Sequence, residues 1–441
     1  MGRRRKKKLP AETVFVEIES LSHDGRGVAH LDGKAIFIDG ALPGEEIGFV
    51  YTSQRRKFDE GRTVEVKKAS PDRVEPKCEH FGVCGGCSLQ HMSPEAQIQS
   101  KQQVMLDNLE RIGKVTPQNI LPPLTDNPWG YRRRARLGVK HVIKKGKVLV
   151  GFREKRAPYV AELNRCHVLH PSAGEKLKDM ASLIEGLSIH DKIPQIEVAV
   201  GDNKTGLVFR HLEPLTDEDK NKLIAFGEQH NFMIYLQPEG PDSIHLIFPE
   251  EETLTYQLPD YDVDYTFEPS DFVQINANLN RKMVNHALAL LEPEEGDDIL
   301  DLFCGLGNFT LPIARKAGKV TGVEGDKLLV ERANTNAKRN NIDNVEFHYA
   351  DLTQDLDTMS WLKRKWDKIL IDPPRTGALE VIEHLPNTKP KRIVYVSCNP
   401  ATLARDADVL VNQYGYKLVS AGVMDMFPHT AHVEAIALFE K

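Results

Sequence analysis

The sequence predicts a multidomain protein: a small β-barrel over residues 10–69, an α+β domain over residues 70–268, and a doubly wound, Rossmann-like α/β domain over residues 269–441. Three observations predict this order. Short strands interrupted by glycine fill the first segment, strands with three helices fill the second, and helices alternate with apolar strands in the third. A chain of 441 residues exceeds the size of one hydrophobic core, so several domains are expected.

Charge is distributed unevenly along the chain. Residues 1–160 contain 30 Lys and Arg against 19 Asp and Glu, whereas the whole chain has a formal net charge of −6. A basic front half predicts a polyanionic partner such as nucleic acid. The basic start, residues 1–8, either contacts that partner or is simply solvated. It lacks the apolar core of a secretory signal, and no apolar run approaches the ~20 residues that span a bilayer, so we expect a cytoplasmic protein without a membrane partner.

The first domain is expected to contain five short strands, separated by turns that contain glycine. They are expected at residues 13–18, 27–30, 34–38, 46–51 and 61–66. Five strands of this length fit a small barrel of the oligonucleotide-binding type. From the pattern alone, such a basic barrel binds either RNA or another protein.

Four cysteines form a candidate metal site at the start of the second domain. Cys78, Cys84 and Cys87 cluster in a glycine-rich segment, and Cys166 follows much later. Zinc and an iron–sulfur cluster both accept four thiolates, but zinc sites usually present two short Cys-x2-4-Cys pairs and only one is found here. The spacing therefore favours iron–sulfur, with structural cysteines that bind no metal as the alternative. Cysteines in a cytoplasmic chain argue for metal binding or catalysis rather than disulfides.

The second domain also contains a helix expected at residues 93–112, which we expect to pack on the last domain. Ser93 is a good N-cap and Pro94 suits the first helical position. Two more helices are expected at residues 171–188 and 217–230, with strands around them. No chemistry can be inferred from this alternation of strands and helices.

Three arginines just before a strand share one strand face, because side chains two apart point the same way. They are Arg132, Arg134 and Arg136. Such a row contacts consecutive phosphates of a nucleic acid, or it is a solvated face with internal ion pairs. The sequence does not decide between the two.

Acidic residues stand at the ends of four successive strands in the last domain. Asp301, Glu324, Asp351 and Asp372 each end or follow an apolar strand, and the carboxyl ends of parallel strands meet at one ligand-binding edge of the sheet. A glycine-rich turn after the first strand lets a ligand approach the backbone. Glu324 suits a ribose diol and Asp351 suits an adenine amine, so the sequence predicts a nucleoside site. No Gly-x4-Gly-Lys-Ser/Thr loop is present, which argues against a nucleoside triphosphate.

A cysteine ends the fifth apolar strand of this sheet. Cys398 is followed by Asn399 and Pro400, and a helix is expected at residues 401–413. A thiol near the positive end of a helix tends to be acidic and nucleophilic. The alternative is a small apolar side chain buried at the end of a strand.

The motifs of the last domain resemble those of the S-adenosylmethionine-dependent RNA (uracil-5-)-methyltransferases. The matching segments occur in order as "DLFCGLGNFT", "DPPR", "YVSCNPATLARD" and "PHTAHVEAIALF". At the other end of the chain, "LSHDGRGVAHLDGKAIFIDGALPGEEI" resembles the TRAM module, an RNA-binding barrel. With the four cysteines the resemblance covers nearly the whole chain, and it is strongest to the branch of the family that acts on bacterial 23S ribosomal RNA.

The resemblance implies two cofactors and their ligands. S-adenosylmethionine is expected at Gln274, Phe303, Asn308, Glu324, Asp351 and Asp372. A [4Fe-4S] cluster is expected on Cys78, Cys84, Cys87 and Cys166. The expected partner is 23S ribosomal RNA, with no obligate protein partner, and the protein is expected to be a monomer.

The resemblance also implies a covalent mechanism. Uracil C5 is a poor nucleophile, and addition of a Cys398 thiolate at C6 raises its electron density before methyl transfer. Glu434 is the expected base for the C5 proton. Without the motif, the alternative for Glu434 is an inward charge on a strand near the end of the chain.

Three other functions are compatible with parts of the sequence. One is a transfer RNA uracil-C5 methyltransferase. Another is an amino-group methyltransferase that uses Asp372-Pro373-Pro374, against which Arg375 and Cys398 both argue, since the amino-methylating motif has an aromatic residue where Arg375 stands. The third is an RNA-binding assembly factor without catalysis.

Overall fold

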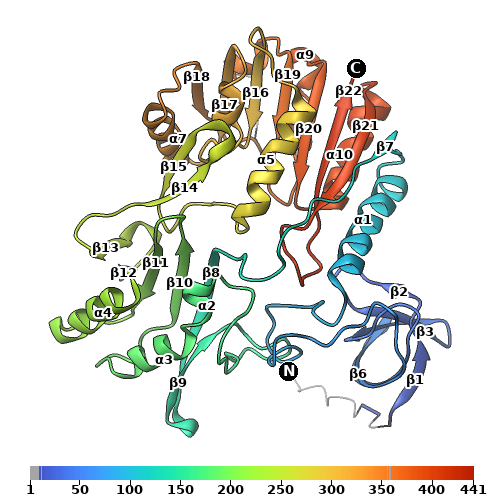
Figure 1. Ribbon diagram of the computed structural model, residues 1–441. Helices are drawn as coiled ribbons and strands as arrows, with labels where there is room; N and C mark the ends of the chain where they lie inside the picture. Colours follow the sequence, from blue (N-terminus) through green and yellow to red (C-terminus); the bar gives the residue numbers. More distant parts are fainter. Residues whose placement is uncertain (1–8, 11, 355, 357–358) are drawn as a thin grey trace, which may run out of the picture. The chain divides into compact units, whose positions relative to one another are not determined.

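The computed structural model describes residues 9–10, 12–354, 356 and 359–441, so the basic start of the chain lies outside the described residues. The chain divides into two compact units (Figure 1). The first contains the residues up to Lys101 together with Glu154–Ala157 and Phe427–His432. The second contains Gln102–Arg153, Pro158–Met426 and Val433–Lys441. No helix within these described ranges is long and apolar enough to cross a membrane.

The first unit is built on a six-stranded sheet. Its order is β1 (Val14–Glu17), β5 (Glu46–Gln54), β6 (Phe58–Lys68), β4 (Lys34–Asp39), β3 (Gly27–Leu31) and β2 (Ser20–Leu21). Just after β1, the Glu19 N–H donates to the Val28 carbonyl of β3 at 2.9 Å, so the sheet curls back on itself. The five expected strands are all present, and the two-residue β2 is additional.

A buried ion pair fixes the segment that leaves this sheet. The Glu45 side chain is fully buried and accepts hydrogen bonds from Arg73 at 2.5 and 2.7 Å. The N–H groups of Leu42 and Ser70 donate to the same carboxylate at 2.8 and 3.2 Å. Burial alone would raise the pKa of Glu45, but the hydrogen bonds from Arg73, Leu42 and Ser70 outweigh burial and lower it.

Helix α1 (Pro94–Arg111) follows as expected, and Ser93 Oγ accepts the Ala96 N–H at 3.3 Å. Gly113, just after α1, lies against α10 (Pro400–Asp408). A Cβ at Gly113 would come within 2.6 Å of the Ala404 carbonyl oxygen, so this close approach requires glycine.

The second unit contains a mixed sheet of six strands. Its order is β13 (His245–Phe248), β12 (Phe232–Gln237), β11 (Thr205–Arg210), β10 (Gln195–Val200), β8 (Arg134–Val142) and β9 (Lys147–Gly151). The helix expected at 217–230 is α4 (Asp217–His230), and its capping box joins Thr216 and Asp219. The helix expected at 171–188 is instead divided into α2 (Pro171–Gly174) and α3 (Leu177–Glu185). Gly174 lies against the Cys166 carbonyl, where a Cβ would approach to 2.4 Å, and the chain changes direction there.

An eight-stranded sheet forms the rest of the second unit. Its order is β18 (Val345–Tyr349), β17 (Lys319–Glu324), β16 (Asp298–Leu302), β19 (Lys368–Ile371), β20 (Arg392–Ser397), β22 (Glu434–Glu440), β21 (Lys417–Met424) and β7 (Asn119–Ile120). The first five strands are parallel, as the sequence predicted, and β22 runs antiparallel to both its neighbours. The larger helices of this part are α5 (Ala277–Leu291), α7 (Lys327–Arg339) and α10. Strand β7 comes from far upstream and was not predicted.

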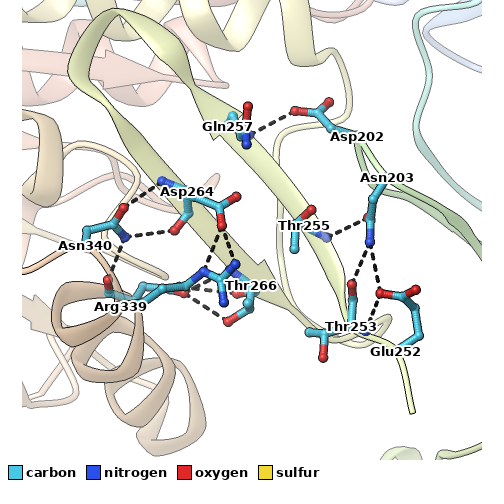
Figure 2. Close-up of polar contacts among 11 residues, drawn as sticks. Asp202, Asn203, Glu252, Thr253, Thr255, Gln257, Asp264, Thr266, Arg339 and Asn340 are labelled. Atoms are coloured by element: carbon cyan, nitrogen blue, oxygen red, sulfur yellow. Dashed lines mark hydrogen bonds and ion pairs between the residues drawn. The ribbon is translucent and has the colours of Figure 1, made fainter. Parts of the chain in front are cut away.

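A hairpin that the sequence analysis missed connects the two sheets of the second unit. It consists of β14 (Leu254–Leu258) and β15 (Val263–Phe267). Figure 2 shows three of the residue pairs that hold it: Asp202–Gln257 at 2.9 Å, Asn203–Thr255 at 3.0 Å and Asn340–Asp264 at 2.8 Å. The first two pairs come from the β10–β11 turn and the third from the end of α7, so the hairpin is fixed from both sides.

The buried Glu45 predicts a large effect of removing its partner. Arg73→Ala leaves a buried, unpaired carboxylate, which should destabilise the first unit by about 3 kcal/mol. Hydrogen exchange of the amide groups in β3 to β6 measures this change. Arg55→Ala, which removes a 59% exposed arginine 3.6 Å from Glu60, is the matched control and should change stability by less than about 1 kcal/mol. Equal effects of the two variants would contradict the interpretation.

Candidate functional site

A glycine-rich turn follows β16 and faces open space. Phe303, Gly305 and Gly307 all have positive φ, of 63°, 54° and 86°, and at Phe303 this conformation is strained. A Cβ added to Gly305 would meet no atom within 4 Å. The backbone at Gly305 therefore leaves space for the close approach of a ligand, whereas Gly307 is buried against Leu311.

Glu324, the last residue of β17, is hydrogen-bonded to this turn. Glu324 accepts the Gly305 N–H at 2.9 Å through Oε2 and the Asp326 N–H at 3.0 Å through Oε1. Burial raises the pKa of Glu324, and the hydrogen bonds from backbone N–H groups oppose that rise. The carboxylate is thus held in one orientation beside the turn.

Two further acidic residues at this edge have strongly raised pKa values. Burial raises the pKa of Asp301 to about 8, with a smaller contribution from the charge of Asp372. Asp301 Oδ2 accepts the Thr310 hydroxyl at 2.5 Å, whereas Oδ1 has no hydrogen-bond partner among the described residues. Asp372, half-buried directly after β19, has its pKa raised to about 7 by desolvation. Buried carboxyl groups of this kind favour a cationic ligand.

The structure places Asp351 differently from the other three strand-end acids. It is exposed after β18, and its carboxylate accepts hydrogen bonds from the Thr353 N–H and hydroxyl at 3.0 and 2.7 Å and from Gln354 at 2.7 Å. The hydrogen bonds from Thr353 lower the pKa of Asp351. Its expected role at an adenine amine stays a prediction.

Tyrosines of the missed hairpin support the glycine-rich turn. Tyr265 donates to the Gly307 carbonyl at 3.0 Å, and Tyr256, stacked on Tyr265, donates to Asn308 Oδ1 at 3.2 Å. Asn308 also exchanges two hydrogen bonds with Asn280 of α5, at 2.9 and 3.0 Å. The signal for this hairpin was available as the alternation Leu254, Tyr256, Leu258, which has the period of a strand.

The remaining expected cofactor residue, Gln274, lines a small cavity. The volume of this cavity is about 20 Å³, and Tyr256 and Asn280 line it as well. The cavity is far too small for a nucleoside. Gln274 nevertheless lies beside the same side chains that support Asn308, which connects it to the glycine-rich turn.

Cys398 lies directly after β20 and is half-buried. The expectation of an acidic thiol was wrong for the protein without ligands: burial, together with the charges of Glu434 and Asp372, raises the pKa of Cys398 to about 11. Arg375 lowers it, but less. The nearby helix end does not compensate for burial and two acidic neighbours.

The structure brings together the residues that the sequence predicted for catalysis. Glu434 is the buried first residue of β22, the strand paired with β20. Asn399 joins the Cys398 turn to the segment after β19, because its Nδ2 donates to the Arg375 carbonyl at 3.0 Å. The Cys398 thiol, the Glu434 carboxylate and the Arg375 guanidinium therefore lie at the same edge of the sheet as Asp372.

The two histidines before Glu434 belong to the first unit. Gln97 Oε1 accepts the His429 N–H at 2.8 Å, and Gln97 Nε2 lies 3.3 Å from His429 Nδ1. His429 is thus fixed by α1 within that unit.

The cysteine loop of the first unit is tightly turned. The Cys84 N–H donates to the His80 carbonyl at 2.9 Å, and the Gly86 N–H lies 3.4 Å from Cys84 Sγ. Cys166 belongs to the second unit. Among the residues that the structure describes, no group of three or more Cys, His, Asp or Glu side chains is placed to hold a metal ion. The iron–sulfur cluster stays a prediction.

The arginine row turns out to be structural in part. The Arg134 guanidinium donates to the carbonyl oxygens of Pro269 and Ser270, both at 2.9 Å, which holds the segment before the 64% exposed Phe272. Arg136 pairs with Glu197 at 2.9 Å. Internal contacts account for Arg134, whereas the Arg136 side chain is 70% exposed beside Glu197 and stays accessible to a phosphate.

Comparison with known proteins finds a family match at each end of the chain. The sequence model of the tRNA (Uracil-5-)-methyltransferase family matches residues 243–441, and that of the TRAM domain matches residues 7–47. The 23S rRNA (uracil(1939)-C(5))-methyltransferase RlmD of Methylococcus capsulatus is 54% identical over 443 residues, which cover 100% of each chain. The protein of the same name from Alkalilimnicola ehrlichii is also 54% identical, over 100% of this chain and 99% of that one.

A solved structure is similar over almost the same length. The tRNA (uracil-54, C5)-methyltransferase of Pyrococcus abyssi, crystallised with S-adenosyl-L-homocysteine, has a TM-score of 0.74 and 26% identity, and the match covers 97% of this chain and all of that one. The ribosomal RNA enzyme of Methylococcus capsulatus shares 54% of its residues with this chain along the full length, against 26% for the Pyrococcus abyssi tRNA enzyme. The higher identity assigns the chain to the branch of the ribosomal RNA enzymes. With its TRAM domain and the strand-end site described above, the chain belongs to the RlmD family of RNA (uracil-5-)-methyltransferases.

Proposed function

We propose that the protein transfers a methyl group from S-adenosylmethionine to C5 of a uridine in 23S ribosomal RNA, the equivalent of uracil 1939 for which its relatives are named. The observation that carries the proposal is the meeting of Cys398, Glu434 and Asp372 at one sheet edge. In this proposal the barrel of residues 10–69 and the domain of residues 70–268 bind RNA, and residues 269–441 carry out the reaction in a monomer.

The strand-end site fits S-adenosylmethionine. The open backbone at Gly305 leaves room for a nucleoside, and Glu324 lies beside that backbone, positioned for a ribose diol. Gln274, Phe303, Asn308 and Asp351 complete the proposed set. The donor supplies a methyl group on a cationic sulfur, and the raised pKa values of Asp301 and Asp372 fit a site for a cation.

Cys398 begins the reaction as a thiolate. Its sulfur forms a bond to C6 of uracil, and the electrons of the C5–C6 double bond move towards C5 and the O4 carbonyl. Burial, together with the charges of Glu434 and Asp372, raises the pKa of the thiol to about 11, and a cationic ligand beside these acids would offset their charge and favour the thiolate. C5 would then form a bond to the methyl carbon of S-adenosylmethionine as the bond between that carbon and the sulfonium sulfur breaks, with S-adenosylhomocysteine as the leaving group.

Glu434 completes the reaction. The methylated C5 still carries its original hydrogen, and Glu434 removes it as a proton. The electrons of that C–H bond restore the C5–C6 double bond, the C6–S bond breaks, and the Cys398 thiolate leaves. Burial of Glu434 at the start of β22 keeps water from competing for this position.

The cysteines are proposed to hold a [4Fe-4S] cluster through Cys78, Cys84, Cys87 and Cys166. The spacing of the four thiols supports this, as does the Gly86 N–H directed at Cys84 Sγ, because N–H groups stabilise thiolate ligands. Four thiolates close the site, so the cluster would cross-link the loop to the segment around Cys166 and take no part in methyl transfer.

Transfer RNA is the second candidate substrate, because the similar Pyrococcus abyssi enzyme acts on tRNA. Supplying both RNAs in one assay distinguishes the two. We expect methylation of 23S RNA alone, in line with the higher identity to the ribosomal RNA enzymes.

The covalent route predicts opposite behaviour of two variants. Cys398→Ala should lower methyl transfer by a factor on the order of 10⁴ or more and form no covalent complex with RNA that carries 5-fluorouridine. Glu434→Gln should accumulate a covalent complex with natural RNA, seen on a denaturing gel, because the C5 proton stays in place. Glu440→Gln, at the far end of the same strand, is the control. Full activity in Cys398→Ala would exclude the route.

The raised pKa of Cys398 predicts how its reactivity depends on pH. In the ligand-free protein, alkylation of Cys398 by iodoacetamide should increase with pH towards a midpoint near 11, because only the thiolate reacts. Glu434→Gln removes one of the charges that raise the pKa, so its midpoint should be lower. Peptide mass spectrometry measures the modification at each pH. An unchanged midpoint of alkylation in Glu434→Gln would show that the charge of Glu434 does not raise the pKa of the Cys398 thiol.

The cluster predicts a specific dependence on one loop cysteine. Protein purified without oxygen should contain about four iron atoms per chain and absorb visible light. Cys84→Ser should lose iron and RNA methylation, while Cys304→Ala, a buried cysteine outside the proposed ligand set, should keep its iron. An iron-free wild-type protein of full activity would disprove the cluster.

A further inference from the structure

A second cavity in the second unit stands apart from the catalytic edge. Its volume is about 260 Å³, and it lies between residues 127–133, the start of α2 and the amino end of α5. No acidic side chain is among its ten lining residues, and neither Cys398 nor Glu434 lines it. The volume is slightly below the roughly 300–1,000 Å³ of small-molecule pockets, which suits one nucleotide rather than a whole cofactor.

The amino end of α5 opens at this cavity. Asn276 is the N-cap: its Oδ1 accepts the Leu279 N–H at 3.2 Å and its carbonyl accepts the Asn280 N–H at 2.8 Å. Ala277 and Asn278, the first two helical residues, line the cavity. The N–H groups at the first positions of a helix have no acceptor within the helix, and together with the helix dipole they favour an anion.

Asn276 offers an additional donor. Its side chain is only 2% exposed, it lines the cavity, and its Nδ2 has no hydrogen-bond acceptor among the described residues. A buried donor without a partner is unfavourable, and in native structures such a group usually indicates a missing ligand or water. The unpaired amide and the helix end thus point independently to an acceptor group in this cavity.

Charged side chains of both signs surround the cavity. Asp126, next to the lining residue Asn127, pairs with Lys282 at 2.9 Å and is hydrogen-bonded by Asn278. Arg133 lines the cavity and pairs with Asp202, and Arg281 pairs with the same carboxylate at 2.9 Å. Two guanidinium groups therefore share one acid. Trp129 contributes an aromatic side chain to the wall, and nucleobases stack on such rings.

We propose that this cavity binds one nucleotide of the substrate RNA away from the methylated base, with its phosphate at the amino end of α5 and its base against Trp129. The proposal rests on the proposed function, since it takes RNA as the substrate. The subsite holds the RNA in register and takes no part in bond making.

Asn276→Asp tests the phosphate contact without removing the helix cap. Aspartate is as good an N-cap as asparagine, so α5 should remain intact, but the amide donor is replaced by a negative charge. Binding of a 23S RNA fragment that contains the target uridine should weaken about tenfold at every sequence tested. The slope of log affinity against log salt should fall by about one, as expected for one lost phosphate contact. Binding of S-adenosylmethionine should be unchanged, which shows that the second unit of the variant is folded.

Trp129→Ala tests the base contact separately. It should weaken RNA binding about tenfold through lost stacking and leave the salt slope unchanged. Asn221→Asp, which makes the same charge change at an exposed position of α4, is the control and should bind RNA like the wild type.

Two results separate failure of this proposal from failure of the proposed function. If Asn276→Asp binds the RNA fragment with wild-type affinity and wild-type slope, the cavity is not a phosphate subsite. If the wild-type protein itself neither binds nor methylates 23S RNA, the proposed function fails. A wild-type enzyme that methylates 23S RNA and a variant with a lower slope would support both.

Discussion

The crowding of acidic side chains at the carboxyl edge of one parallel sheet is the constraint on which the rest of the site depends. Asp301, Glu324 and Asp372 come from adjacent strands, and burial raises the pKa of all three. A folded protein tolerates such a cluster when its function uses it. The cluster favours a cationic ligand. Burial, with Glu434 and one member of the cluster, Asp372, raises the pKa of the Cys398 thiol, so under the proposed function a cationic ligand near Asp372 both fits the site and favours the thiolate.

The supporting structure is supplied by segments far apart in the sequence. The β14–β15 hairpin contacts the glycine-rich turn through Tyr256 and Tyr265, and polar residues from a second sheet and from α7 hold the hairpin itself (Figure 2). Strand β7 adds the edge of the catalytic sheet from residue 119 onward. Several distant parts of the second unit are therefore joined to the glycine-rich turn and to the sheet that carries it.

Local patterns predicted the elements, and tertiary contacts decided what the patterns left open. The parallel strands, the strand-end acids and the place of Cys398 followed from apolar runs and their last residues. The two-residue β7 has no pattern of its own, and the role of Arg134 depends on carbonyl groups 135 and 136 residues further along the chain. The expectation of an acidic Cys398 thiol was wrong because it considered only the nearby helix end. Burial and the charge of Glu434 raise the pKa of the thiol, and the folded structure was needed to show their effect.

The most direct test of the account is the product. Purified protein is incubated with labelled S-adenosylmethionine and, in parallel, unmodified 23S RNA and unmodified transfer RNA, and the labelled nucleoside is identified and its position mapped. The account predicts 5-methyluridine in 23S RNA alone, at the uridine equivalent to 1939 in the relatives. Label in an amino-methylated nucleoside, or in transfer RNA only, would contradict it.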